Sequence, residues 1–371
     1  MSLSAKARKR ILIILSSIVG VLAALVAVVW LGTYHPKPVQ AEPVFSRTAE
    51  TGSSAAPARI LQAGQNIKVL NWNVQYMAGK NYVFWYDEWD GSGPDAKPSR
   101  ADVEATWTEL LRVILDENPD VIILQELHEN HITTGYENQL QRLLNSLPDE
   151  YAYSTSAWYW KAFFVPLPQL MGRVGMKLAI VSKYQIDAAR RHQLPLMPND
   201  PLTRELNFKR AVLEAQLPVQ GGKPLSLFSI HMDAFAQGSD TMERQVDHVL
   251  KLLQETQAAG KSFAIAGDFN LVPPGLSYSR LPDDEKPMFK PETEISRLYQ
   301  VFKGYPTLPQ VDGPDWRSYL THFPNISDAP DRVLDYFFVS DNIQPSAFYV
   351  RQHDTLHISD HLPTVLTFNV N

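Results

Sequence analysis

Cysteine is absent from this chain of 371 residues. Its absence excludes disulfide bonds, zinc sites built on thiolates and cysteine nucleophiles. A chain without cysteine fits a protein exported by a bacterium, although it does not identify a compartment. The composition is otherwise that of an ordinary globular protein, with enough residues to enclose a sizeable core.

Basic residues are sparse outside the N-terminus. The first 35 residues hold four basic side chains, between Lys6 and Arg10, and no acid, so the remainder carries a net charge of −10 against −6 for the whole chain. Elsewhere the basic residues gather only at Lys183, Arg190-Arg191 and Lys209-Arg210. An acidic body argues against tight binding to long nucleic acid through phosphate contacts. It does not exclude a nuclease, because bound metal ions supply positive charge locally.

A long uncharged run, Ile11–Tyr34, is rich in Ile, Leu, Val and Ala. As a helix it would span the roughly 30 Å of a bilayer core. The alternative is a cleaved signal peptide ending near Val39-Gln40-Ala41, but the run exceeds the roughly 7–15 apolar residues typical of such a peptide. The sequence therefore predicts a single-pass transmembrane anchor over residues 11–34.

The basic tail over residues 1–10 favours a cytoplasmic N-terminus under the positive-inside rule. The catalytic part would then be extracytoplasmic, and periplasmic if the protein comes from a Gram-negative bacterium. The expected partners are the membrane bilayer, through the helix, and a substrate; no obligate protein partner is evident.

Residues 35–65 are rich in Pro, Ala, Ser and Gly and are predicted to form a flexible linker. Residues 66–371 show neither an internal repeat nor a second domain boundary. There, β-rich apolar runs alternate with amphipathic helical runs, which is typical of a layered α/β domain. Strands are expected at 67–74, 121–125, 178–182, 211–217, 225–231, 263–266, 333–339 and 365–370, and helices at 101–117, 137–147, 241–258 and 294–302.

Two connections in this domain are unusually long and aromatic, Tyr76–Ser99 and Trp158–Gly172. Connections of this length in a compact domain are commonly functional or disordered. Their aromatic content argues against disorder. We expect them to lie either in a membrane interface or packed beneath their own loops.

Polar side chains stand where six of the apolar runs end. Functional groups collect at such positions because the rigid sheet fixes them while the loops stay open. They are Asn73, Glu126, His231, Asp268 with Asn270, Asp335, and Asp360 with His361.

The oxygen donors Asn73, Glu126 and Asp360 suit a hard cation such as Mg²⁺, with Mn²⁺ or Ca²⁺ as alternatives. A phosphate ester needs its non-bridging oxygens neutralised and a water activated in line with the leaving group. These donors therefore point to metal-assisted hydrolysis of a phosphoester.

The remaining groups fit the proton chemistry of such a reaction. Asp268 is placed to orient or deprotonate water, and Asn270 to donate a hydrogen bond to the phosphoryl group. Asp335 would fix the tautomer of His361 and raise its basicity. His231 would be a second imidazole, able to protonate the leaving oxygen or to bind phosphate.

From Ile67 to Val370 the ordered blocks resemble the endonuclease/exonuclease/phosphatase superfamily, which includes deoxyribonucleases, apurinic endonucleases, neutral sphingomyelinases and inositol-polyphosphate 5-phosphatases. Gly267-Asp268-Phe269-Asn270 and Ser359-Asp360-His361-Leu362-Pro363 are the most specific. The resemblance implies a four-layer α/β sandwich of the DNase I-like type, with the site at one edge of two packed sheets. It implies metal binding by Asn73, Glu126 and Asp360, and catalysis by His231, Asp268, Asn270, Asp335 and His361.

The presence of His231 is similar to the two-histidine members, the deoxyribonucleases and sphingomyelinases. The segment Arg173–Ser182 departs from the family pattern, because Met176-Lys177-Leu178 replaces its usual Gly-Asn-Ala type of run. A solvated lysine is the simpler interpretation of Lys177, and a phosphate contact is the alternative.

The anchor, the acidic body and the aromatic loops favour a phosphodiesterase that cleaves a phospholipid or sphingolipid-like headgroup at the membrane surface. The alternative is an extracytoplasmic nuclease acting on DNA or RNA, in which aromatic side chains stack on unpaired bases. A binding module without activity is disfavoured by the intact set of site residues.

Overall fold

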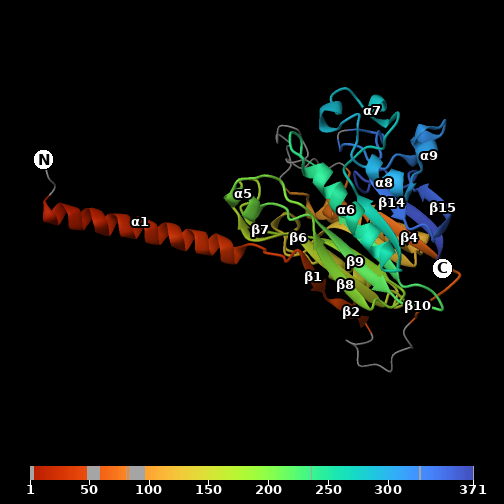
Figure 1. Cartoon of the computed structure of the whole chain (residues 1–371), viewed down its shortest axis with the longest axis horizontal. Coiled ribbons are helices and arrows are strands. Elements are labelled where there is room, and N and C mark those ends of the chain that lie inside the picture. Colours follow the sequence, from red (N-terminus) through yellow and green to blue (C-terminus); the bar gives the residue numbers. More distant parts are fainter. Residues whose placement is uncertain are drawn as a thin grey trace.

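The computed structural model describes residues 4–47, 59–80, 82, 97–234, 236–325 and 327–370. Two seven-stranded sheets pack face to face, and helices lie on their outer faces, so that the body is a four-layer α/β sandwich (Figure 1). This arrangement confirms the predicted fold class.

The first sheet has the order β15 (Gln344–Val350), β16 (Thr364–Val370), β4 (Gln65–Asn73), β5 (Val121–His128), β7 (Gly172–Ser182), β6 (Tyr153–Val165) and β2 (Val44–Ser46). The second has the order β1 (Val39–Glu42), β8 (Ala188–Gln193), β9 (Ala211–Leu217), β11 (Leu225–His231), β12 (Ser262–Asp268), β14 (Asp335–Val339) and β13 (Lys303–Tyr305). The short strands β3 (Leu61–Gln62) and β10 (Val219–Gln220) form a separate parallel pair.

The alternation of apolar residues along the strands separates three cores. One lies between the sheets, and the other two lie under the helices on each outer face. The first sheet is covered by α3 (Arg100–Glu117) and α4 (Gln139–Ser146), and the second by α6 (Thr241–Ala258) and α8 (Ser296–Val301). Ser99 caps α3 by accepting a hydrogen bond from the backbone of Asp102.

The remaining short helical elements lie in the connections. They are α5 (Pro201–Leu206), α7 (Ser277–Arg280), α9 (Leu308–Asp312) and the single turns η1 (Gln75–Met77), η2 (Ile132–Thr134), η3 (Lys286–Met288) and η4 (Trp316–Tyr319).

The N-terminal helix α1 (Ala5–Gly32) projects away from the sandwich, and none of its residues is buried (Figure 1). It is long and apolar enough to cross a membrane, a test that a signal sequence also passes. Its C-terminal end meets β6, where Thr33 forms an isolated bridge with Ala162.

Part of the segment 35–65, predicted as a flexible linker, is instead built into the sheets. Val39–Glu42 pairs antiparallel with β8, and Val44–Ser46 pairs antiparallel with β6. These short strands lie at the edges of the two sheets, where a neighbouring strand offers unpaired backbone groups. Residues 48–58 of the segment lie outside the described part.

The connection expected at Trp158–Gly172 is mostly a β-hairpin. The strands β6 and β7 continue to Val165 and from Gly172, so only six residues join them. Of the other long connection, residues 81 and 83–96 lie outside the described part, while Tyr82 is buried.

Candidate active site

The eight predicted site residues come together where strands of the two sheets end. The parallel pairs β4–β5 and β11–β12 place Asn73 beside Gln125 and His231 beside Asp268. The antiparallel pair β12–β14 then places Asp335 opposite Asp268. The carboxyl ends of adjacent parallel strands meet at one edge of a sheet, which explains why separate sequence blocks converge.

Asp268 lies at the centre of this cluster. Its Oδ2 is 3.4 Å from Nε2 of His231 and 3.4 Å from Nε2 of His361. Its Oδ1 accepts a 2.9 Å hydrogen bond from the backbone N–H of Asn270. One carboxylate thus faces two imidazoles, an arrangement suited to moving a proton between water and a leaving group.

Asn73 joins the central carboxylate to Glu126. Its amide nitrogen donates to Oε1 of Glu126 at 3.0 Å and to Oδ2 of Asp268 at 3.2 Å. Its side-chain oxygen accepts from the backbone of Gln75, which leaves one lone pair on that oxygen. Ser359 donates to the backbone oxygen of Asn73 and to Asp360, and so ties Asp360 to this edge.

The backbone at two site residues lies in the left-handed region. Glu126 has φ of 63° within a register shift between β5 and β7, and Asn270 has φ of 52°. A bulge of this kind redirects the side chain of Glu126. Left-handed backbone geometry is unfavourable for a residue other than glycine by about 1–3 kcal/mol. Gly267 is required for a different reason, because a Cβ there would collide with the carbonyl oxygen of Ile230.

The two histidines differ in charge. Burial alone lowers the pKa of His361, but Asp335 and Asp268 more than offset this, and the pKa is raised well above its usual value. The contact responsible is a 2.8 Å hydrogen bond between Nδ1 of His361 and Oδ2 of Asp335. Burial and the nearby Arg210 cation lower the pKa of His231. The two imidazoles are therefore shifted in opposite directions, His361 toward its charged form and His231 toward its neutral form.

The carboxyl groups of the cluster have the chemistry of a divalent-cation site. Burial and the neighbouring Asp360 raise the pKa of Glu126 to about 7, and burial raises the pKa of Asp268 to about 6. The pKa of Asp360 is also raised, mainly by burial. Buried carboxylates, of which Asp360 raises the pKa of Glu126 by its negative charge, are oxygen donors of the kind that a hard divalent cation requires.

Arg210 belongs to the site and was not singled out from the sequence. Its side chain is buried, and its guanidinium lies 5.1 Å from the ring of Tyr159, whose hydroxyl is 3.4 Å from Nδ1 of His231. Its Nε is 3.6 Å from Asp233, and Nε and Nη1 find no hydrogen-bond partner in the described part of the chain. The one sequence feature that pointed to Arg210 was the basic pair Lys209-Arg210 just before a predicted strand.

His322 and Lys80 also border the cluster without a signal in the sequence. The ring of His322 lies 4.5 Å from that of His361. Lys80 donates to the backbone oxygens of Asn325 and Ser327, and its charge lies near Asp360. Neither residue stands at the end of an apolar run, which was the pattern used to find the others.

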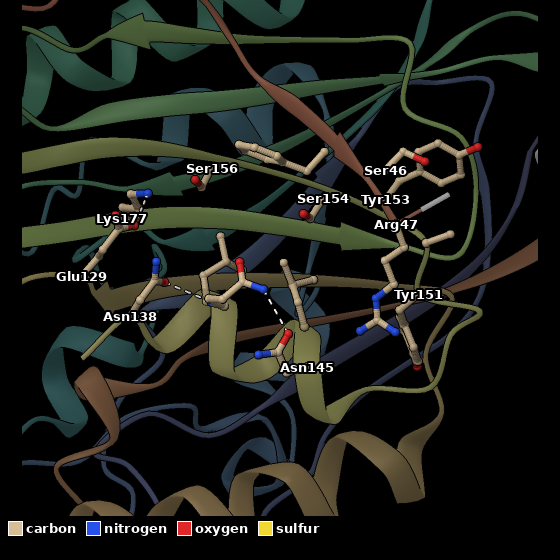
Figure 2. Close-up of a pocket in the computed structure, with 15 residues that line it drawn as sticks. Ser46, Arg47, Glu129, Asn138, Asn145, Tyr151, Tyr153, Ser154, Ser156 and Lys177 are labelled. Atoms are coloured by element: carbon tan, nitrogen blue, oxygen red, sulfur yellow. Dashed lines mark hydrogen bonds and ion pairs between the residues drawn. The ribbon is translucent and has the colours of Figure 1, made fainter. Parts of the chain in front are cut away.

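Lys177 lies away from the cluster. Its ammonium pairs with Glu129 and lies 4.2 Å from the ring of Trp158. It lines a separate, mainly polar cavity of about 230 Å³ between α4, β2 and β6 (Figure 2). The phosphate contact considered for Lys177 is therefore not supported, and the lysine is paired rather than simply solvated.

The sandwich with carboxylates and imidazoles at its edge is that of a metal-dependent phosphoester hydrolase. Residues 70–361 match the model of the Endonuclease/Exonuclease/phosphatase family, and the chain belongs to that family. Its enzymes use divalent metal ions, generally Mg²⁺. No curated protein sequence matches significantly.

Several solved structures share the fold. An endonuclease/exonuclease/phosphatase from Beutenbergia cavernae is 19% identical, with 83% of this chain and 72% of that chain covered and a TM-score of 0.53. The human Nocturnin catalytic domain with bound sulfate is 17% identical, with 89% and 98% covered and a TM-score of 0.51. A family protein from Leptotrichia buccalis is 17% identical, with 82% and 99% covered and a TM-score of 0.52.

Proposed function

We propose that this chain is a membrane-anchored phosphodiesterase that hydrolyses phospholipid or sphingolipid-like headgroups. The observation that carries the proposal is the closed network in which Asp268 touches both imidazoles while Asn73 joins it to Glu126. The same network would serve any phosphodiester, so the substrate class is argued separately from the surface of the molecule.

Glu126 and Asp360 would bind Mg²⁺ through their carboxylate oxygens. Asn73 would join them as a ligand with its amide group turned, because its nitrogen, rather than its oxygen, faces Glu126 and Asp268 in this structure. Bound there, the ion would supply positive charge against the phosphoryl oxygens. The raised pKa of Glu126, to which the charge of Asp360 contributes, supports this assignment, because a divalent ion offsets the repulsion between the two carboxylates.

Asp268 would orient the attacking water and take up its proton. His361, charged and fixed by Asp335, would stabilise the phosphoryl group or protonate the leaving oxygen. His231 is neutral and buried, and it would donate a hydrogen bond within the same group of atoms. Asn270 donates one amide hydrogen to the Met232 carbonyl, and its second hydrogen remains for a phosphoryl oxygen.

Arg210 would bind a non-bridging phosphoryl oxygen. Its Nη1 is buried without a hydrogen-bond partner in the described structure, and its Nε has only the 3.6 Å ion pair with Asp233, although the side chain lies beside His231. A buried donor that stays without a hydrogen bond lowers the stability of the fold by about 1–3 kcal/mol. A planar guanidinium also matches a phosphate group in charge and geometry. An anionic substrate satisfies both requirements.

The hairpin of β6 and β7 supports a lipid substrate. Near its tip, Phe163 and Phe164 are 62% and 40% exposed, and Leu167 and Met171 are also exposed. The inner aromatic residues of the same hairpin are packed, as Tyr159 is fully buried. The prediction that the aromatic residues pack under their loop therefore holds at the base and fails at the tip.

The tip lies where α1 reaches the sandwich. Phe163 packs near Gly32, and Thr33 bridges to Ala162. If α1 spans a bilayer, its last turn brings the exposed phenylalanines to the membrane interface, where aromatic side chains are favoured.

A substrate comparison tests the proposal. The full chain is reconstituted with Mg²⁺ into vesicles of phosphatidylcholine, phosphatidylglycerol and sphingomyelin, and headgroup release is measured beside nicking of supercoiled plasmid. Headgroup release without nicking is the expected result. Nicking at a comparable rate would favour the nuclease alternative, and failure of both reactions would contradict either function.

A further inference from the structure

His322 offers an imidazole beside the site that the proposed reaction does not use. It lies between η4 and β14, and its backbone bridges to both Arg332 and His361. The rings of His322 and His361 cross at 67°, with centroids 4.5 Å apart. Nδ1 of His322 is buried and has no hydrogen-bond partner among the described residues.

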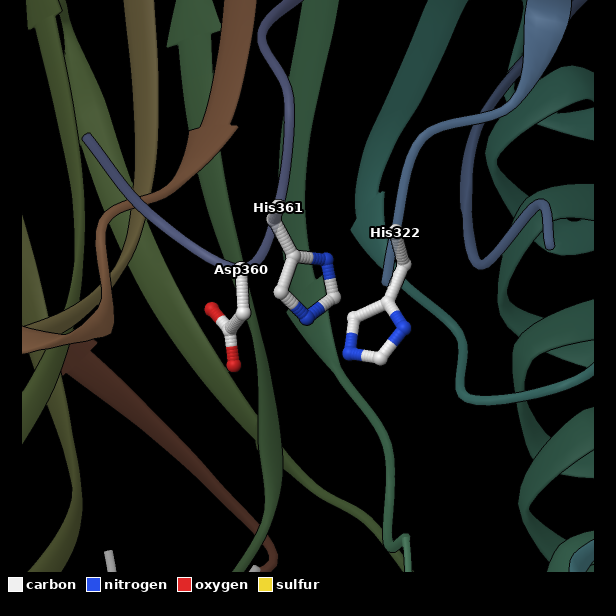
Figure 3. Close-up of side chains that lie close together, drawn as sticks. All are labelled: His322, Asp360 and His361. Atoms are coloured by element: carbon white, nitrogen blue, oxygen red, sulfur yellow. The ribbon is translucent and has the colours of Figure 1, made fainter. Parts of the chain in front are cut away.

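His322, His361 and Asp360 converge on one space. A ring nitrogen of each histidine and a carboxylate oxygen of Asp360 all lie within 4.8 Å of one another, and Figure 3 shows the three side chains turned toward that space. Nδ1 of His361 is already bonded to Asp335, so Nε2 remains as the ligand atom. A carboxylate behind an imidazole is the usual support of a metal-bound histidine.

The donor set is different from that at Glu126 and Asn73. Two imidazoles and one carboxylate suit zinc and similar late transition ions, whereas Mg²⁺ prefers oxygen donors. Three protein ligands also leave one position of a tetrahedral site open.

We propose that His322, Asp360 and His361 form a second cation site that binds Zn²⁺, and that zinc bound there inhibits the enzyme. Inhibition follows from two shared groups. Asp360 also belongs to the proposed magnesium site, and Nε2 of His361 otherwise faces Asp268. The inhibitory part rests on the proposed function, whereas zinc binding does not.

A spectroscopic experiment tests binding without any substrate. Because the chain contains no cysteine, the variant His322→Cys places one thiolate at the site and nowhere else. We expect the full-length variant in detergent to develop a sulfur-to-cobalt charge-transfer band in the near ultraviolet when Co²⁺ is added, and to lose it when Zn²⁺ is added. A folded variant that binds Co²⁺ without this band would overturn the site.

A second experiment measures zinc affinity and inhibition. Equilibrium dialysis compares the unchanged chain with His322→Gln and with His357→Gln, an exposed histidine outside the cluster. His322→Gln should weaken zinc binding by at least about tenfold, because even replacing a residue that only supports a metal ligand typically lowers metal affinity by that factor. His357→Gln should leave the affinity for zinc unchanged. Equal affinities in all three proteins would refute the site.

Inhibition is read on a soluble diester, with each protein compared with its own zinc-free rate. The half-inhibitory zinc concentration should be at least about tenfold higher for His322→Gln than for the unchanged chain. In the unchanged chain it should also rise as the Mg²⁺ concentration is increased, because both ions need Asp360. If zinc binds through His322 but the rate is unaffected, the inhibitory part is wrong.

Discussion

Asp335 is the residue that gives His361 its charge. Its Oδ2 accepts the 2.8 Å hydrogen bond from Nδ1, while its Oδ1 is buried without a partner in the described structure. Among the described residues, the side chain of Asp335 therefore makes its hydrogen bond to the imidazole alone. This makes Asp335 a positioning residue, one that acts on the substrate through its neighbour.

Asp335→Asn should reduce kcat by about a hundredfold, the lower range of what a general acid contributes. It should also move the alkaline limb of the pH profile to lower pH. The carboxylate raises the pKa of His361, so its loss lowers that pKa, and the imidazolium is then lost earlier as pH rises. A kcat–pH series measures both effects. Asp341→Asn, at a surface turn, is the control, and an unshifted alkaline limb would contradict the role of Asp335.

Arg210→Gln should lower kcat/KM by about tenfold to a hundredfold, since a hydrogen bond to a charged group contributes about 1.5–3 kcal/mol. Arg210→Lys should recover only part of this, because an ammonium lacks the planar fork of the guanidinium. Steady-state kinetics on a soluble diester give the values. Arg190→Gln, exposed on β8, is the matched control. Arg210→Gln with unchanged kinetics would remove this residue from the substrate site.

Among the elements, the hairpin of β6 and β7 is the one on which the proposed lipid substrate rests. Replacing Phe163 and Phe164 together with Ser should lower headgroup release from vesicles by about tenfold, because each ring loses part of the roughly 1.5–3 kcal/mol of a buried phenylalanine. Hydrolysis of a soluble diester should not change, since neither side chain reaches the cluster. The ratio of the two rates is the measurement, with Leu115→Ser on α3 as an exposed apolar control. Equal losses on both substrates would count against the membrane role.

The sequence predicted most long elements closely. The helix Thr241–Ala258 and the strands β9 and β11 have the bounds that the sequence predicts. The spacing of apolar residues in each of them reflects whether one side or both sides of the element are buried. The strands β1 and β2 were missed, since each is very short and lies beside proline in a segment of linker-like composition. The extended hairpin was missed because aromatic and proline content hid the alternation of β6.

The eight site residues could be proposed from the sequence because they follow apolar runs; the structure brings them together, and their roles stay predictions. Arg210 and His322 could not be found in this way. What distinguishes them is burial and proximity to His231 and His361, and both arise only when the two sheets pack together.

At the scale of the whole molecule, three features agree. The apolar helix α1, the exposed hairpin tip beside it and the acidic body support the proposal of an enzyme held against a bilayer rather than one attracted to a polyanion. The site itself lies at the strand ends of the sandwich and depends on neither α1 nor the hairpin tip for any contact among the eight residues.

The central claim is that this cluster hydrolyses phosphodiesters with a bound divalent ion. Its most direct test is the rate at which the full chain hydrolyses a soluble nitrophenyl phosphodiester, with Mg²⁺ and after chelation, compared with Glu126→Gln and the control Glu129→Gln. The account predicts turnover that chelation abolishes and Mg²⁺ restores, a normal rate for Glu129→Gln, and a loss of at least about a hundredfold for Glu126→Gln. Turnover that survives both chelation and the Glu126 substitution would contradict it.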